Sequence, residues 1–139
     1  MDDSVSGDNV KGRLARMKQN VKLVFFTQTF GCDTCLPARQ VVDQLANLSE
    51  RIIVEEHNLV LDKQHAERFG IDRAPAIIVS GETDLGIRYY GVPAGHELTS
   101  ILEAVVLVGT RELTLKQESL AALATLSRPI DIKVFVTPT

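Results

Sequence analysis

The chain has 139 residues, of which 45% are hydrophobic and 24% charged, as in a folded domain with its own core. Its formal charge of −3 gives no electrostatic reason to bind nucleic acid or an anionic membrane. No apolar run approaches the roughly 20 residues of a membrane-spanning helix, and the acidic start lacks the apolar core of a signal peptide. Two cysteines do not make a disulfide-stapled secreted scaffold, so we expect a cytoplasmic protein.

The hydrophobic pattern predicts strands and helices that alternate along most of the chain. We expect residues 1–9 to be loose and residues 9–20 to form a short amphipathic helix. The first two strands, with the helix between them, predict a right-handed parallel crossover, and the third and fourth strands predict a hairpin. The predicted strands lie at 21–27, 51–56, 76–79 and 86–90, and the predicted helices run from the cysteines to about 49, at 62–69 and at 95–109.

A further helix and strand are predicted after this set. Thr114 and Gln117 have the spacing of a capping box, so we expect a helix to open at Thr114. The alternation of apolar residues over 130–136 predicts a strand. Exposed strand edges recruit other chains, so we expect this strand to join the sheet or to pair with another copy. The inner face of the helix is expected to carry Leu120, Leu123 and Ala124.

The most informative stretch runs from Val21 to Pro37. Its apolar residues 23–26 do not alternate, which predicts a strand covered on both faces, and a short turn then leads to Cys32 and Cys35 at the start of a helix. The free N–H groups and the dipole of a helix start favour an anion, so a sulfur placed there ionises more easily. The thiolate is the nucleophile of disulfide exchange, and a second sulfur can resolve the mixed disulfide. We therefore predict a thiol–disulfide exchange site in which Cys32 attacks and Cys35 resolves.

Two other interpretations of the cysteine pair stay open. A zinc site needs four ligands, and the candidate histidines stand at spacings that match no zinc-finger template. A purely structural disulfide would close a loop of only four residues and stabilise the fold by about 2 kcal/mol, less than a longer loop would give. Redox chemistry is therefore the favoured interpretation. The candidate zinc ligands are His57, His65 and His96.

Pro75 is the second informative position. It begins the third predicted strand, where a proline is either an ordinary strand-entry residue or part of a cis peptide bond at a tight turn. We favour the cis form. With this turn beside the two sulfurs, the backbone of Ala74 would be free to pair with an extended substrate.

The end of the chain repeats the strand that precedes the cysteines. Residues 134–139, Val-Phe-Val-Thr-Pro-Thr, match residues 24–29, Val-Phe-Phe-Thr-Gln-Thr, at four of six positions. In the first copy Cys32 follows three residues later, whereas in the second copy the chain stops. This echo indicates the opening strand of a second unit of the same kind.

Several segments resemble the protein disulfide oxidoreductases of thermophilic archaea and bacteria, which carry two thioredoxin-fold units in tandem. The resemblance runs from about residue 20 to the end, and the chain is similar to the first unit. It implies an α/β, thioredoxin-like fold with a four-stranded mixed sheet flanked by helices. It also implies Cys32 as exposed nucleophile, Cys35 as buried resolver and Pro75 in cis. The resembling segments are 21–26, Cys32-Asp33-Thr34-Cys35, 71–76, 88–97 and 134–139.

The resemblance divides the chain into three expected regions. Residues 1–20 are a tail and short helix, residues 21–109 a thioredoxin-like domain, and residues 110–139 a helix and strand that lead into a missing second unit. Two departures from the pattern concern the site. Asp33-Thr34 replaces the better-known inserts between the cysteines. Phe26 stands where thioredoxins place a buried Asp, a role for which Glu55 or Glu56 is the candidate replacement.

The resemblance implies protein disulfides or dithiols as partners. No cofactor is expected besides the redox-active Cys32–Cys35 disulfide, and no metal. A thioredoxin-reductase-like reductant and a dimer through the C-terminal strand stay open. Two rival hypotheses remain beside an exchange enzyme: a noncatalytic unit that docks partners for the second unit, and an electron-relay domain that feeds a peroxidase.

Overall fold

The structure is a computed structural model that describes residues 3–137, with the side chains of residues 9–137. Met1, Asp2, Pro138 and Thr139 lie outside the described residues, so the last two positions of the predicted C-terminal echo do as well. The elements are α1 (Asp3–Ala15), β1 (Val21–Thr27), α2 (Cys35–Ala46), β2 (Ile52–Asn58), α3 (Lys63–Phe69), β3 (Ala76–Ser80), β4 (Ile87–Tyr90), α4 (His96–Thr110) and α5 (Gln117–Ala124).

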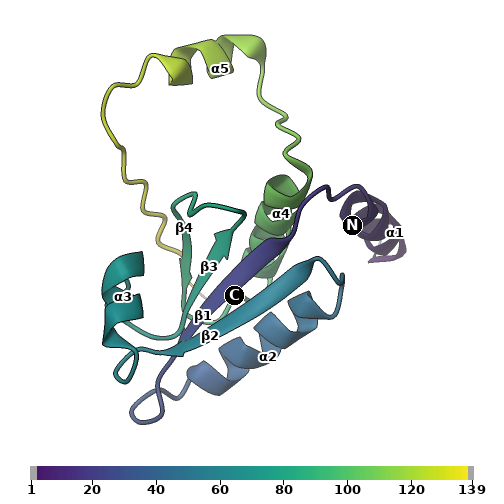
Figure 1. Ribbon diagram of the computed structural model, residues 1–139. Helices are drawn as coiled ribbons and strands as arrows, with labels where there is room; N and C mark the ends of the chain where they lie inside the picture. The colour runs from purple at the N-terminus through teal and green to yellow at the C-terminus, as the bar shows by residue number, and fades with distance from the viewer. Residues whose placement is uncertain (1–2, 138–139) are drawn as a thin grey trace.

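The four strands form one mixed sheet in the order β2-β1-β3-β4 (Figure 1). β1 is parallel to β2 and antiparallel to β3, and β3 is antiparallel to β4. The predicted crossover and hairpin are therefore confirmed. Elements between residues 21 and 110 lie within two residues of their predicted bounds, except that α2 ends at Ala46 and not near residue 49.

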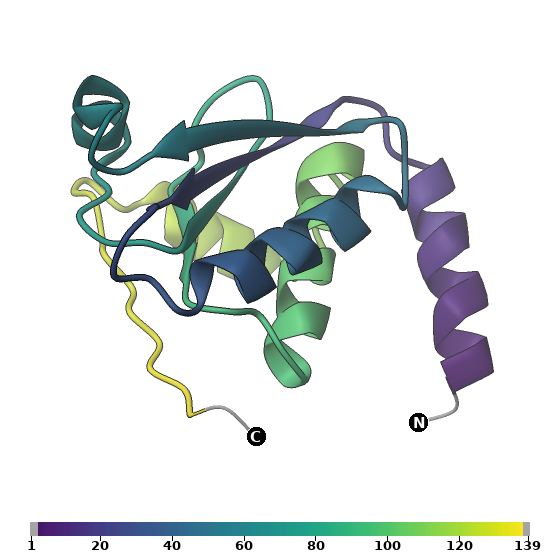
Figure 2. The ribbon, with the colours of Figure 1, turned by 90° about the horizontal axis from the view of Figure 1, so that it is seen from below.

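β1 is covered on both faces, as its continuous apolar run predicted. Leu23 and Phe25 pack into a core cluster with residues of α2 and α4, while Val24 and Phe26 pack into a second cluster with Ala66 of α3. Figure 2 shows α2 and α4 together on one side of the sheet and α3 on the other. All four β1 side chains are fully buried, so the strand is the centre of a three-layer arrangement.

The N-terminal helix differs from its prediction. Residues 1–9 were expected to be loose, but α1 begins at Asp3 and ends at Ala15. The hydrophobic pattern marks only the part of a helix that packs on the core, and residues 3–9 precede that part. Met17 lies beyond the helix and is nevertheless buried, because the chain turns there and the N–H groups of Lys18 and Gln19 donate to the carbonyl of Gly109.

The C-terminal arm, residues 111–137, also differs from its prediction. α5 begins at Gln117, its N-cap is Lys116 without a side-chain hydrogen bond, and none of its residues is buried, so the expected capping box and inner face are wrong. Residues 130–136 form no strand and are exposed. An alternating segment becomes a strand only beside a neighbour. The arm runs away from the body of the fold as far as α5 and then back toward it (Figure 1), but it pairs with no strand of the sheet.

Gly109 permits the close approach of α4 to the turn after α1. A Cβ atom at this position would lie 2.6 Å from Cγ of the buried Met17. We expect Gly109→Ala to lower the free energy of unfolding by about 1–3 kcal/mol through overpacking. Gly12→Ala is the matched control, because nothing lies within 4 Å of its Cβ, and it should stabilise α1 by about 0.5–1 kcal/mol. Urea unfolding measures both, and a Gly109→Ala variant as stable as the wild type would contradict the close packing.

Asp84 and Arg88 close the hairpin of β3 and β4. Arg88 donates to both carboxylate oxygens of Asp84, at 2.8 and 2.5 Å, and also to the carbonyl of Phe69 at 3.0 Å. The hydrogen bonds from Arg88 hold the pKa of Asp84 below its ordinary value. Its stabilisation is therefore present above the unfolded pKa of about 3.9 and is lost as the pH falls through the lower folded pKa.

We expect Asp84→Asn to reduce stability at pH 7 by about 0.5–1 kcal/mol, because the pair is partly exposed. The difference from the wild type should shrink as the pH is lowered from 7 to 2, because protonation of the wild-type carboxyl removes its charge. Denaturant unfolding at both pH values tests this, with Asp72→Asn as the control because it removes a fully exposed pair with Arg73. A deficit of equal size at both pH values would contradict the ionic origin.

Candidate active site

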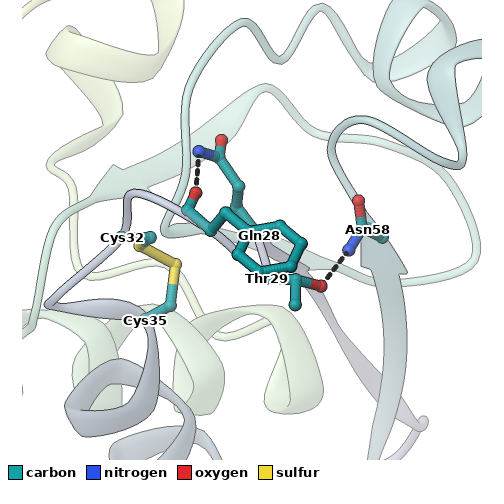
Figure 3. The surroundings of a disulfide bond; sticks show 6 residues. Gln28, Thr29, Cys32, Cys35 and Asn58 are labelled. Atoms are coloured by element: carbon teal, nitrogen blue, oxygen red, sulfur yellow. Dashed lines mark hydrogen bonds between the residues drawn. A yellow bond between two sulfur atoms is a disulfide. The ribbon is translucent and has the colours of Figure 1, made fainter.

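The two cysteines lie where β1 passes into α2. They form a disulfide, with their Cα atoms 5.5 Å apart (Figure 3). Cys35 is the first residue of α2 and is 4% exposed, whereas Cys32 precedes the helix and is half-buried. The structure therefore brings the predicted pair together and makes only Cys32 accessible to a sulfur of another protein.

The first turn of α2 presents unneutralised N–H groups at this site. The N-cap residue Thr34 makes no side-chain cap hydrogen bond, and the first turn holds no acidic residue. Pro37, the third residue of the helix, has no N–H and so removes no helical hydrogen bond. The amides of Cys35 and Leu36 and the positive end of the helix dipole thus favour a thiolate at Cys32.

Pro75 lies at the same end of the sheet. Ala76, the residue after it, is opposite Phe26 in the antiparallel pair of β1 and β3. The turn before β3 therefore meets the point at which β1 leaves for the cysteines. The Ala74–Pro75 peptide bond is cis. The Pro75 carbonyl accepts from the N–H of Gly91 at 3.1 Å, whereas the Ala74 backbone joins none of the backbone hydrogen bonds outside helices and strands in residues 3–137.

Asn58, which was not among the residues predicted for the site, joins the cysteine loop to the loop that follows β2. Its Nδ2 donates to Thr29 Oγ1 at 3.2 Å, and its Oδ1 accepts from the N–H groups of Val60 and Leu61 (Figure 3). An Asn that ends a strand is a recognisable turn signal. Its bond to Thr29 has no sequence signal, because it joins residues 29 positions apart.

The two carboxylates proposed as proton acceptors are engaged elsewhere. Glu55 pairs with His57 at 2.9 Å, and this hydrogen bond is the main cause that lowers the pKa of Glu55. Glu56 pairs with Arg39. Phe26 is fully buried, with its ring centre 5.3 Å from that of His57. The structure thus gives no support to either glutamate in that role.

The three histidines considered as zinc ligands do not form a metal site. His57 and His65 stack at 4.1 Å between ring centres, and His96 is the first residue of α4. Among the described residues, no group of three or more His, Cys, Asp or Glu side chains is arranged to hold a metal ion.

In the same part of the chain, no helix combines the length and apolar character needed to cross a bilayer.

No family model matches the chain. A curated thioredoxin of Methanocaldococcus jannaschii is 29% identical over 84 residues, which cover 60% of this chain and 93% of the relative. A protein of Bacillus subtilis named NADH dehydrogenase is 26% identical over 133 residues, or 94% of this chain. The chain spans only 24% of that relative, and only 12% of a similarly named protein of Ferdinandcohnia aciditolerans.

Solved structures give the clearer likeness. The NTD_N/C domain of alkylhydroperoxide reductase AhpF from Enterococcus faecalis has a TM-score of 0.74 and 22% identity, covering 85% of this chain and 57% of that one. A protein disulfide oxidoreductase from Aeropyrum pernix has a TM-score of 0.73 and 22% identity, covering 86% of this chain and 53% of that one. At this identity the likeness concerns the fold, and at that level it confirms the resemblance found in the sequence. The chain has a thioredoxin-like α/β fold, with a C-x-x-C pair where its central strand meets a helix.

Proposed function

We propose that the chain is a thiol–disulfide exchange module that acts on protein disulfides and dithiols. The observation that supports this most strongly is the unequal exposure of a bonded pair, with Cys32 half-buried and Cys35 4% exposed at the start of α2. A structural disulfide gains nothing from having one sulfur accessible, whereas exchange requires it.

The reaction uses only the two sulfurs. The Cys32 thiolate attacks one sulfur of a substrate disulfide, forms a mixed disulfide and releases the other substrate sulfur as a thiolate. Cys35 then attacks Cys32, which breaks the mixed disulfide and closes the Cys32–Cys35 bond. Two electrons pass to the substrate, which takes up two protons as a dithiol, and the reverse sequence oxidises a dithiol. No other bound group is needed.

The turn at Pro75 is the proposed substrate-binding element. It meets the end of β1, as the pairing of Ala76 with Phe26 requires, and Ala74 is only half-buried. Among residues 3–137 the Ala74 backbone joins no backbone hydrogen bond outside helices and strands, so it can offer hydrogen bonds to an extended substrate segment next to the reacting disulfide.

Two cysteine variants test the assignment of roles. Cys32→Ser should abolish the reduction of insulin by dithiothreitol above the uncatalysed rate, because it removes the attacking sulfur. Cys35→Ser should retain the attack and accumulate a mixed disulfide between Cys32 and the substrate, because no sulfur resolves it. Non-reducing electrophoresis and mass spectrometry detect the adduct. A wild type without activity would support the noncatalytic docking hypothesis, and an adduct on Cys35 in the Cys32→Ser variant would reverse the roles.

A second candidate function is an electron relay within a larger reductase. The names of the relatives favour it, because two are NADH dehydrogenases and one similar structure belongs to alkylhydroperoxide reductase AhpF. In this case the Cys32–Cys35 disulfide receives two electrons from a reductase and passes them to a peroxidase. To separate the two functions, the reduced protein is mixed with insulin and with an oxidised thiol peroxidase, and the two rates of reduction are compared. Faster reduction of the peroxidase supports the relay, and faster reduction of insulin supports general exchange.

We propose that the C-terminal arm belongs to a second unit of the same kind. The pattern Leu-Ala-x-Met-x-x-x-Val at 14–21 returns as Leu-Ala-x-Leu-x-x-x-Ile at 123–130, ahead of the echoed strand. In the first copy the large apolar residues of this pattern are at most 6% exposed, whereas their counterparts in the second are at least 50% exposed. The residues compared are Leu14, Met17 and Val21 with Leu123, Leu126 and Ile130. The second copy thus has the apolar pattern of a segment that packs on a core, but its large apolar side chains are exposed. The proposed regions remain 1–20, 21–109 and 110–139, in a cytoplasmic protein.

Limited proteolysis tests the arm. Trypsin should cut first after Lys116 or Lys133, because these sites lie in exposed segments without packing, and should leave residues 21–109 intact. Mass spectrometry of the early fragments identifies the sites. Protection that grows with protein concentration would show instead that another copy covers the arm, and an arm as resistant as the domain at every concentration would contradict its exposure.

A further inference from the structure

The loop between β1 and α2 is held by side chains. Residues 28–33 take part in none of the backbone hydrogen bonds that residues 3–137 form outside helices and strands. Gln28 holds the loop from within, because its Nε2 donates to the carbonyl of Phe30 at 2.5 Å. Asn58 holds it from outside, through the bond from its Nδ2 to Thr29 Oγ1 at 3.2 Å. The placement of Cys32 therefore depends on two side-chain amides.

The amide of Asn58 has a fixed orientation. Its Oδ1 accepts from Val60 and Leu61 at 2.9 and 3.0 Å, which leaves its Nδ2 to face the cysteine loop (Figure 3). Its backbone is anchored as well, since its N–H donates to Asp62 Oδ2 and its carbonyl accepts from the Asp62 N–H. The loop after β2 thus presents a rigid donor to Thr29.

We propose that Asn58 is a positioning residue for the Cys32–Cys35 pair, which acts through Thr29 to hold the loop in the conformation that closes the disulfide. This proposal deepens the exchange function proposed above and rests on it. In the disulfide form, the ring itself restrains the loop. In the dithiol form, the side-chain amides of Gln28 and Asn58 restrain it. Loss of one of these hydrogen bonds therefore raises the conformational entropy of the loop more in the dithiol form than in the disulfide form, which makes formation of the disulfide less favourable.

The equilibrium with glutathione measures this effect. One dithiol protein and one glutathione disulfide give one disulfide protein and two glutathione thiols, so two electrons pass to glutathione and every proton is retained on sulfur. Each variant is equilibrated over a range of glutathione ratios, its thiols are trapped by acid and alkylation, and the fraction of each form is counted by mass spectrometry.

Thr29→Val is the test variant, because it removes the acceptor at an exposed position with almost no change of volume and leaves the turn at Asn58 in place. It should disfavour the disulfide about threefold, which corresponds to roughly 14 mV for a two-electron couple. Thr29→Ser keeps the hydroxyl and should retain the wild-type equilibrium. An unchanged constant in Thr29→Val, or one shifted toward the disulfide, would overturn the proposal, and so would an equal shift in Thr29→Ser.

Unfolding of the two redox forms separates positioning from plain stability. A merely structural bond would lower the stability of the disulfide and dithiol forms equally in Thr29→Val and leave the glutathione equilibrium unchanged. The readout is also independent of protein substrates. If the wild type fails to reduce insulin, the exchange function fails, while the glutathione equilibrium still reports whether Asn58 positions the pair.

Discussion

The site depends on the burial of β1 on both of its faces. A strand with one buried face can slip by two residues, but every side chain from Leu23 to Phe26 has its own place in one of two core clusters. The register of β1 against both neighbours is therefore strongly specified. Its parallel partner β2 and its antiparallel partner β3 are aligned so that the cysteine loop, the loop after β2 and the turn at Pro75 meet at one end of the sheet.

Much of the domain could be predicted, because its signals are local in the sequence. A continuous apolar run specifies β1 to the residue, and Gly70 ends α3 where the pattern indicated. The residue at which α1 begins and the absence of a strand at residues 130–136 could not be predicted in this way. The first residues of α1 carry no hydrophobic pattern, and residues 130–136 carry the pattern of a strand without the neighbour that would make them one.

The candidate site divides in the same way. The cysteine pair could be found because both sulfurs stand within four residues at a strand-to-helix junction. The bond between Asn58 and Thr29 could not, because it arises from the parallel register that sets Asn58 opposite Thr27. The expected proton acceptors failed for a related reason, since Arg39 and His57 approach Glu56 and Glu55 only once α2 and β2 are in place.

The central claim is that the two sulfurs differ in accessibility and so in role. Reduced protein treated at neutral pH with iodoacetamide at less than one equivalent tests it directly, with peptide mapping of the modified cysteine. The account predicts that Cys32 is alkylated first and that Cys35 remains largely unmodified. Equal modification of both cysteines, or faster modification of Cys35, would contradict it.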